Sequence, residues 1–211
     1  MNIDQLLWPH VSAMHPDRNL RDDLDRITRA SWRGQAGVAL EEARRLRDVE
    51  TSRKVSAETK GQIYLGALLA LIPIIVSLTE KEFIKEIFTF SAWYHYCGAL
   101  LFFAAVIYGV GGFVSAFRSI NVGNFNRVDV DELVASASAP DPQEYLVKEL
   151  LKSVRCDRQA VNHKISYVIV TQQLVFRMAL FFMLSLAVTE VGRLGEILVC
   201  SSQDRTKCLD R

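Results

Sequence analysis

The stretch CGALLFFAAVIYGVGGFVSAF, residues 97–117, holds 21 residues and no charged side chain. A helix of this length rises about 31 Å, which matches the roughly 30 Å hydrocarbon core of a lipid bilayer. A surface helix of a soluble domain would carry polar residues along one face, because that face meets water. The stretch therefore predicts a membrane-spanning helix rather than a buried core helix.

Two further apolar blocks lie on either side of this stretch. Residues 63–78 form an uncharged block of 16 residues that includes Pro73, which neighbouring helices can accommodate in a membrane. Residues 165–188 form a block of 24 with a single charge, Arg177. Three such blocks leave too little polar chain to cover them in water. We predict an all-α integral membrane protein with three transmembrane helices and cytoplasmic amphipathic helices.

The predicted organisation has five segments along the chain. They are a cytoplasmic N-terminal helical region at 1–60, a transmembrane helical hairpin at 61–117, a cytoplasmic loop and helix at 118–164, a third transmembrane helix at 165–190 and an external tail at 191–211.

Helical periodicity predicts where the cytoplasmic helices lie. Apolar residues at helical spacing indicate one amphipathic helix at 16–31 and another at 38–60, and the second is expected to continue into the first span. A third helix should begin after Asp141, with Pro142 at its first position and Glu144 placed for a capping box. We expect it to continue into the third span as one long helix.

Positive charge is distributed unevenly across the predicted spans. Thirteen Lys and Arg residues lie near the membrane ends on the side of the N-terminus, against six on the other side. Cationic residues near membrane ends favour the cytoplasm. The N-terminus is therefore predicted to be cytoplasmic and the C-terminus periplasmic.

The tail sequence CSSQDRTKC places Cys200 and Cys208 eight positions apart with polar residues between them. In an oxidising compartment such a pair can close a small loop, which predicts a disulfide. The alternative is two unpaired surface thiols. A metal site is disfavoured, since no histidine or further cysteine lies nearby to complete a tetrahedral set. Cys97 and Cys156 are expected to stay reduced.

Arg177 raises the question of a charge near mid-bilayer. On a helical wheel Ser166 and Gln173 fall on the same side, which predicts a polar transmembrane seam of Ser166, Gln173 and Arg177. In the alternative, Arg177 reaches the cytoplasmic headgroups, but the remaining apolar segment is then too short to cross comfortably.

Small residues recur at four-residue spacing in the second span. Such pairs let helix backbones approach closely, so these residues are predicted to pack helices together: Ala105, Gly109, Gly111, Gly112, Ser115 and Ala116.

The sequence holds no motif that would carry catalysis or bind a cofactor. There is no phosphate-binding P-loop and no GxSxG nucleophile motif, and the four histidines are scattered. The net charge of +1 argues against a nucleic-acid partner. We predict a protein without catalytic activity, cofactor or bound metal.

A cytoplasmic amphipathic helix, a tight transmembrane hairpin and a following cytoplasmic helix together resemble the SLATT class of small bacterial conflict-system proteins, over roughly residues 36–160. The resemblance is architectural and carries over no site residues. It implies a membrane-perturbing or pore-forming effector of anti-phage defence in the bacterial inner membrane, gated by a nucleotide signal or a cytoplasmic protein partner.

Two functions follow from these observations. The first is an oligomeric inner-membrane effector that breaches the membrane, with the third spans of a homo-oligomer gathered at its centre. The alternative is a non-catalytic membrane anchor or sensor that recruits a cytoplasmic partner.

Overall fold

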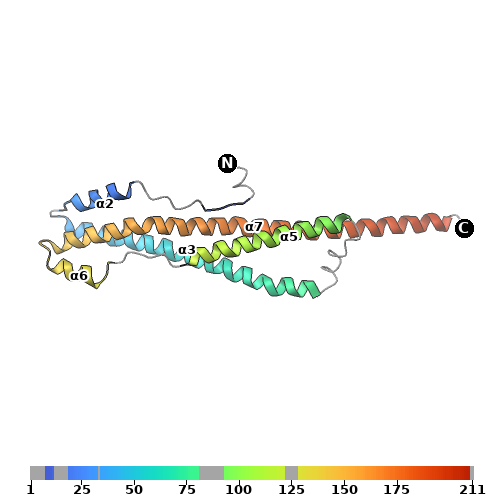
Figure 1. The fold of residues 1–211 in the computed structure, drawn as a ribbon, viewed down its shortest axis with the longest axis horizontal. Coiled ribbons are helices and arrows are strands. Elements are labelled where there is room, and N and C mark those ends of the chain that lie inside the picture. Colours follow the sequence, from blue (N-terminus) through green and yellow to red (C-terminus); the bar gives the residue numbers. More distant parts are fainter. Residues whose placement is uncertain (1–7, 12–18, 33, 81–92, 122–127, 210–211) are drawn as a thin grey trace. The chain divides into compact units, whose positions relative to one another are not determined.

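The structure is a computed structural model that describes residues 8–11, 19–32, 34–80, 93–121 and 128–209, with the backbone alone at 74–80 and 196–209. Within these residues all regular structure is helical, which confirms the predicted all-α class. The helices are α2 (Leu20–Arg29), α3 (Ala36–Glu80), α5 (Trp93–Ile120), α6 (Val130–Ala137) and α7 (Pro142–Leu209) (Figure 1).

Two of these helices are much longer than the apolar blocks inside them. Helix α3 has 45 residues and continues without a break through Pro73, and α7 has 68 residues. The predicted continuity of the helix at 38–60 with the first apolar block is therefore confirmed, as is that of the helix after Asp141 with the third.

The start of α7 follows the predicted capping only in part. Pro142 is its first residue, and Oδ1 of Asp141 accepts hydrogen bonds from the backbone N–H groups of Gln143 (3.1 Å) and Glu144 (3.0 Å). The carboxylate of Glu144 pairs with Nζ of Lys148 at 2.8 Å, and this hydrogen bond lowers the pKa of Glu144. A complete capping box forms instead at α6, between Asp129 and Glu132.

Among the described residues, two helices are long and apolar enough to cross a membrane: α5 and the part of α7 from Pro142 to Gly195. Three spans were predicted, and α3 is not among the two. The side chains of its apolar block are described only up to Pro73, so the remaining predicted span, at residues 63–78, lies partly outside the described residues.

The chain divides into two compact units. Unit 1 comprises residues 1–63 and 115–170, and unit 2 comprises residues 64–114 and 171–211.

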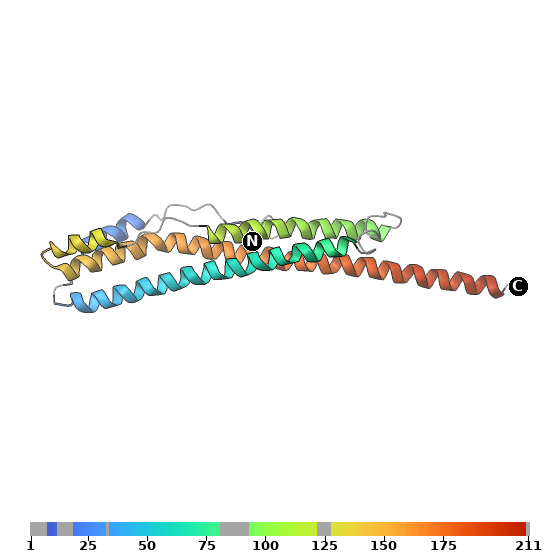
Figure 2. The ribbon, with the colours of Figure 1, turned by 90° about the horizontal axis from the view of Figure 1, so that it is seen from below.

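In unit 1, α3 and α7 lie side by side and run in the same direction (Figures 1 and 2). In three polar contacts between these helices, the α7 residue follows its α3 partner by 106, 108 or 109 positions in the chain. Because this difference is nearly constant, residue numbers rise in the same direction along both helices. Buried residues recur every seven positions on both helices, the repeat of a left-handed coiled coil. They are Ala36, Ala43, Glu50 and Ala57 on α3, and Val147, Val154, Val161 and Val168 on α7.

In unit 2, α5 runs antiparallel to α7. Near the start of α5, the hydroxyl of Ser185 donates to the carbonyl oxygen of Gly98 at 2.8 Å. Further along α5, Gly109 lies against Met178 and Gly112 lies against Leu174. Later residues of α5 therefore contact earlier residues of α7, as expected for antiparallel helices.

Candidate functional site

The outer surface of unit 2 is apolar. On α5 the large side chains of Leu100 (71% exposed), Ile107 (58%) and Val110 (60%) face outward, whereas Ala105 and Gly112 are buried. A water-soluble helix shows the opposite pattern, with its large apolar residues inside. We call this surface the apolar band: Leu100, Phe103, Val106, Ile107, Val110, Phe113 and Val114 on α5, and Phe176, Leu180, Met183, Leu184, Val191 and Leu194 on α7.

Charged residues are rare among the described side chains of unit 2. Its described side chains, at 64–73, 93–114 and 171–195, include three charged ones: Arg177, Glu190 and Arg193. An extended apolar surface with so few charges is suited to contact with lipid or with another apolar helix, because neither demands hydrogen bonds from it.

The three residues of the predicted polar seam lie in different environments. Ser166 belongs to unit 1, and its hydroxyl donates to the backbone oxygen of Asn162 in the same helix at 3.1 Å. In unit 2, Gln173 is exposed and Arg177 is half-buried.

Other polar residues of α7 occupy its buried face in unit 2. Thr171, Ser185 and Thr189 are almost fully buried. Ser185 bonds to the backbone of α5, and the hydroxyl of Thr189 donates to the oxygen of Ser185 at 2.9 Å. They were not identified from the sequence, because the single charge of the block, Arg177, lies on a different side of the helix. Thr171 and Ser185 are 14 residues apart, which is two heptads, and this spacing indicates that they lie on the same face of the helix.

The small residues of α5 lie where that helix packs closely. In unit 2, Ala105 and Gly112 are buried and Gly109 and Gly111 are half-buried. A β-carbon on Gly109 would lie 3.0 Å from Sδ of Met178, and one on Gly112 would lie 3.5 Å from Cγ2 of Val175.

The last two small residues of the set, Ser115 and Ala116, are buried in unit 1, where the hydroxyl of Ser115 donates to the oxygen of Tyr167 at 3.1 Å.

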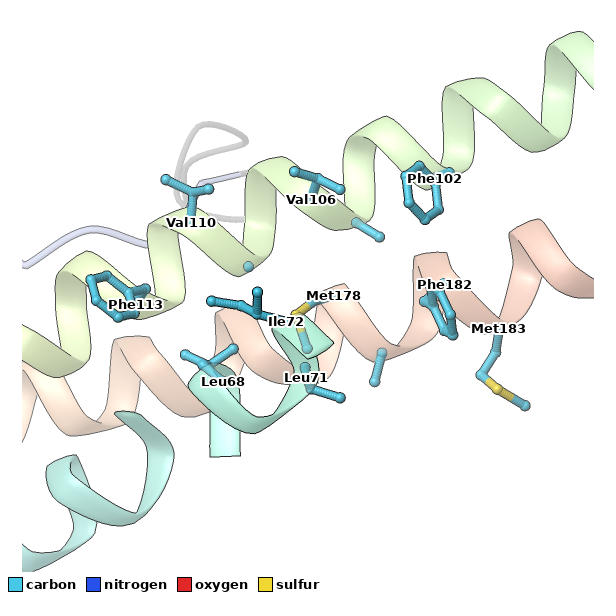
Figure 3. A pocket seen from close by; sticks show the side chains of 13 residues that line it. Leu68, Leu71, Ile72, Phe102, Val106, Val110, Phe113, Met178, Phe182 and Met183 are labelled. Atoms are coloured by element: carbon cyan, nitrogen blue, oxygen red, sulfur yellow. The ribbon is translucent and has the colours of Figure 1, made fainter. Parts of the chain in front are cut away.

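An apolar groove of about 430 Å³ lies between α3, α5 and α7 in unit 2 (Figure 3). Leu68, Leu71 and Ile72 approach it from α3, with Phe102 and Val106 among the residues of α5. Every described residue that lines the groove is apolar or glycine. These residues therefore favour an apolar occupant such as a lipid chain or an apolar side chain.

Ion pairs join α3 to α7 in unit 1. Glu50 is buried, and its carboxylate contacts Nη1 of Arg53 at 2.9 Å and Nε of Arg158 at 3.3 Å. Nearer the apolar blocks, Nζ of Lys164, which is 5% exposed, contacts Glu58 at 2.5 Å. We call these five residues the ion-pair ladder.

The ion-pair ladder fixes how α3 and α7 are aligned. Buried charges are costly without their partners, and a shift of one helix against the other would separate Glu50 from Arg158 and Lys164 from Glu58. A further ion pair, from Nε of Arg155 to Asp23 at 2.6 Å, attaches α2 to α7.

The predicted disulfide conflicts with the backbone. Helix α7 continues through both Cys200 and Cys208, which places them about 12 Å apart along the helix axis. Two cysteines can be bridged only when their Cα atoms lie within about 7 Å. The prediction assumed that residues 201–207 form a small loop, whereas they continue the helix. Of the cysteines whose side chains are described, Cys97 and Cys156 are free.

Comparison of the chain with protein-family models, with curated proteins and with solved structures finds no match. The functional argument therefore rests on the residues and their geometry.

Proposed function

We propose that the protein is an oligomeric inner-membrane effector of bacterial anti-phage defence, which perturbs or permeabilises the membrane when triggered. The observation that carries this proposal is the apolar band on two helices of membrane-spanning length. The architectural resemblance to SLATT proteins supplies the biological class.

In this proposal the apolar parts of α3, α5 and α7 are three spans, with the N-terminus in the cytoplasm and the C-terminus in the periplasm. The short first block is accommodated beside the other two, as helices that mismatch the bilayer can be at modest cost. The charged residues of unit 1 then lie on the cytoplasmic side, in keeping with the excess of Lys and Arg there.

Triggering is proposed to act on unit 1. Because α3 and α7 each continue from unit 1 into unit 2, a partner protein or nucleotide that changes their packing in unit 1 acts on the same helices that enter the membrane. The ion-pair ladder gives this packing a defined alignment, and a trigger would work by changing it.

The alternative function, a membrane anchor or sensor, is favoured by one feature of unit 1. Helix α6 exposes Val130, Leu133 and Val134, which lie at helical spacing on one face. A cytoplasmic partner could bind there without any breach of the membrane.

The proposal is tested by inducible expression in a bacterium, with and without phage challenge, while a voltage-sensitive dye reports membrane potential. The effector should arrest growth and depolarise the cells. An anchor should leave the potential intact although the protein is inserted in the membrane, and that result would reject the effector function.

Arg177→Leu is expected to insert normally and to lose most of the depolarisation. A half-buried cation in an apolar helix usually faces protein or water, where it contributes to function rather than to insertion. Arg193→Leu is the matched control, since Arg193 is exposed at the far end of the apolar part of α7. If Arg177→Leu depolarises cells as strongly as the unmodified chain, Arg177 serves only as a headgroup anchor.

A further inference from the structure

The outward face of α7 in unit 2 carries a regular stripe of exposed residues. Gln173, Phe176, Leu180, Met183 and Ala187 follow one another at alternating steps of three and four residues, and all five are exposed. We call this stripe the outer seam. A mean step of 3.5 residues is the repeat by which one helix packs along another in a left-handed coiled coil.

The opposite face of α7 already packs with the same repeat. Leu174, Met178 and Ser185 lie on the face that meets α5, and their steps are four and seven residues. A straight helix would let a 3.5-residue stripe drift by about 20° per heptad. The supercoil that keeps the inner residues against α5 therefore also keeps the outer seam on one side of α7. Met183 of the seam lies at the edge of the apolar groove and is still 64% exposed.

Gln173 argues against lipid as the only occupant of the outer seam. Its side chain is exposed, and none of the described side-chain hydrogen bonds involves its amide. A primary amide in hydrocarbon loses its hydrogen bonds to water and needs a partner of its own. Since the amide carries both a donor and an acceptor, the same side chain of an identical helix can satisfy it reciprocally.

A second copy of this chain is the occupant that meets all these conditions. Copies inserted by the same route have the same orientation, so their α7 helices are parallel and like residues meet across the symmetry axis. The seam itself is uncharged between Gln173 and Ala187, so like residues can meet without repulsion. A single polar residue in an otherwise apolar seam is known to select one register and one assembly size.

We propose that a second copy of this chain packs in parallel on the outer seam of α7, with Gln173 hydrogen-bonded to Gln173 of its neighbour. The inference rests on the membrane location in the proposed function, and it identifies the contact that makes the effector oligomeric. It places Arg177 beside this contact rather than in it.

Single cysteines placed along α7 in a cysteine-free background test the contact in membranes. Oxidative cross-linking should peak at positions 173, 176, 180, 183 and 187, and should be at least several-fold weaker at the flanking positions 172, 179 and 184. Equal cross-linking on all exposed faces, or none with inserted protein, would overturn the proposal and leave lipid on the seam.

The wild-type chain provides a second measurement that needs no cysteine substitution. In nanodiscs, photobleaching steps of a labelled chain should count more than one copy, whereas a strictly monomeric chain would overturn the proposal. Gln173→Leu should weaken association by about threefold to tenfold, the range expected for an interhelical hydrogen bond in a membrane. Gln172→Leu, which alters the neighbouring exposed amide off the seam, should have little effect.

The two proposals fail separately. If the chain cross-links at the outer seam but does not depolarise cells, the effector function is rejected and the proposed contact is retained. If the chain depolarises cells but shows no cross-linking at the outer seam, the proposed contact is rejected and the effector function is retained.

Discussion

Lys164→Ala should destabilise unit 1 by about 1.5–3 kcal/mol, the range expected for a hydrogen bond to a charged group, together with the lost packing of the buried lysine stem. The ammonium group of Lys164 is buried and contacts Glu58 of α3 at 2.5 Å. Removing it leaves the partly buried Glu58 carboxylate without this contact. Denaturation of the detergent-solubilised protein by SDS, followed by circular dichroism, measures the loss.

The matched control is Lys152→Ala on the same helix. Lys152 pairs with Glu149 within α7, and both side chains are partly exposed, so its loss should cost less than about 1 kcal/mol. The double variant Lys164→Met, Glu58→Met should recover most of the lost stability, because two apolar side chains need no partner charge. Equal effects of Lys164→Ala and Lys152→Ala would show that the ion-pair ladder does not hold α3 to α7.

The second large effect is expected from Gly112→Leu in unit 2. A β-carbon at Gly112 would already touch Val175, Leu174 and Leu68 at 3.5, 3.6 and 3.7 Å, so the outer carbons of leucine have no space. Overpacking of this kind costs about 1–3 kcal/mol or more, since α3, α5 and α7 must move apart. The same SDS denaturation should show earlier unfolding, and the apolar groove should enlarge.

Gly66→Leu on α3 separates this packing effect from the effect of losing a glycine. Gly66 is exposed, and a β-carbon there would meet nothing within 4 Å. Because leucine favours a helix over glycine by somewhat less than about 1 kcal/mol, this variant should be as stable as the original or more stable. If both leucine variants behave alike, close packing at Gly112 is not what holds the three helices.

The helices themselves could be predicted from local sequence. Asp141 before Pro142 marked where α7 begins, because a side-chain oxygen there satisfies free backbone N–H groups. The uncharged run at 97–117 identified α5, because its length and composition match a bilayer. These signals depend on neighbours a few residues apart, so the sequence carries them without any knowledge of the fold.

The tail shows where a local signal misled. The polar residues between Cys200 and Cys208 are compatible with a small loop, but the backbone stays helical to Leu209. Polar residues permit a turn without requiring one, and a helix that has already formed extends by one hydrogen bond for each residue added.

By itself the sequence determined the all-α class, the continuous helices α3 and α7 and the separation of charged from apolar chain, since each depends on local pattern alone. Only the tertiary structure decided that α3 and α7 run parallel, that Lys164 pairs with Glu58, and that Ser185 rather than Ser166 bonds to another helix. The two members of each pair lie 106 and 87 positions apart in the chain. Which polar residue is buried depends on the rotation of each helix toward its neighbour, and that rotation is fixed by packing across the interface rather than by the residues of one helix.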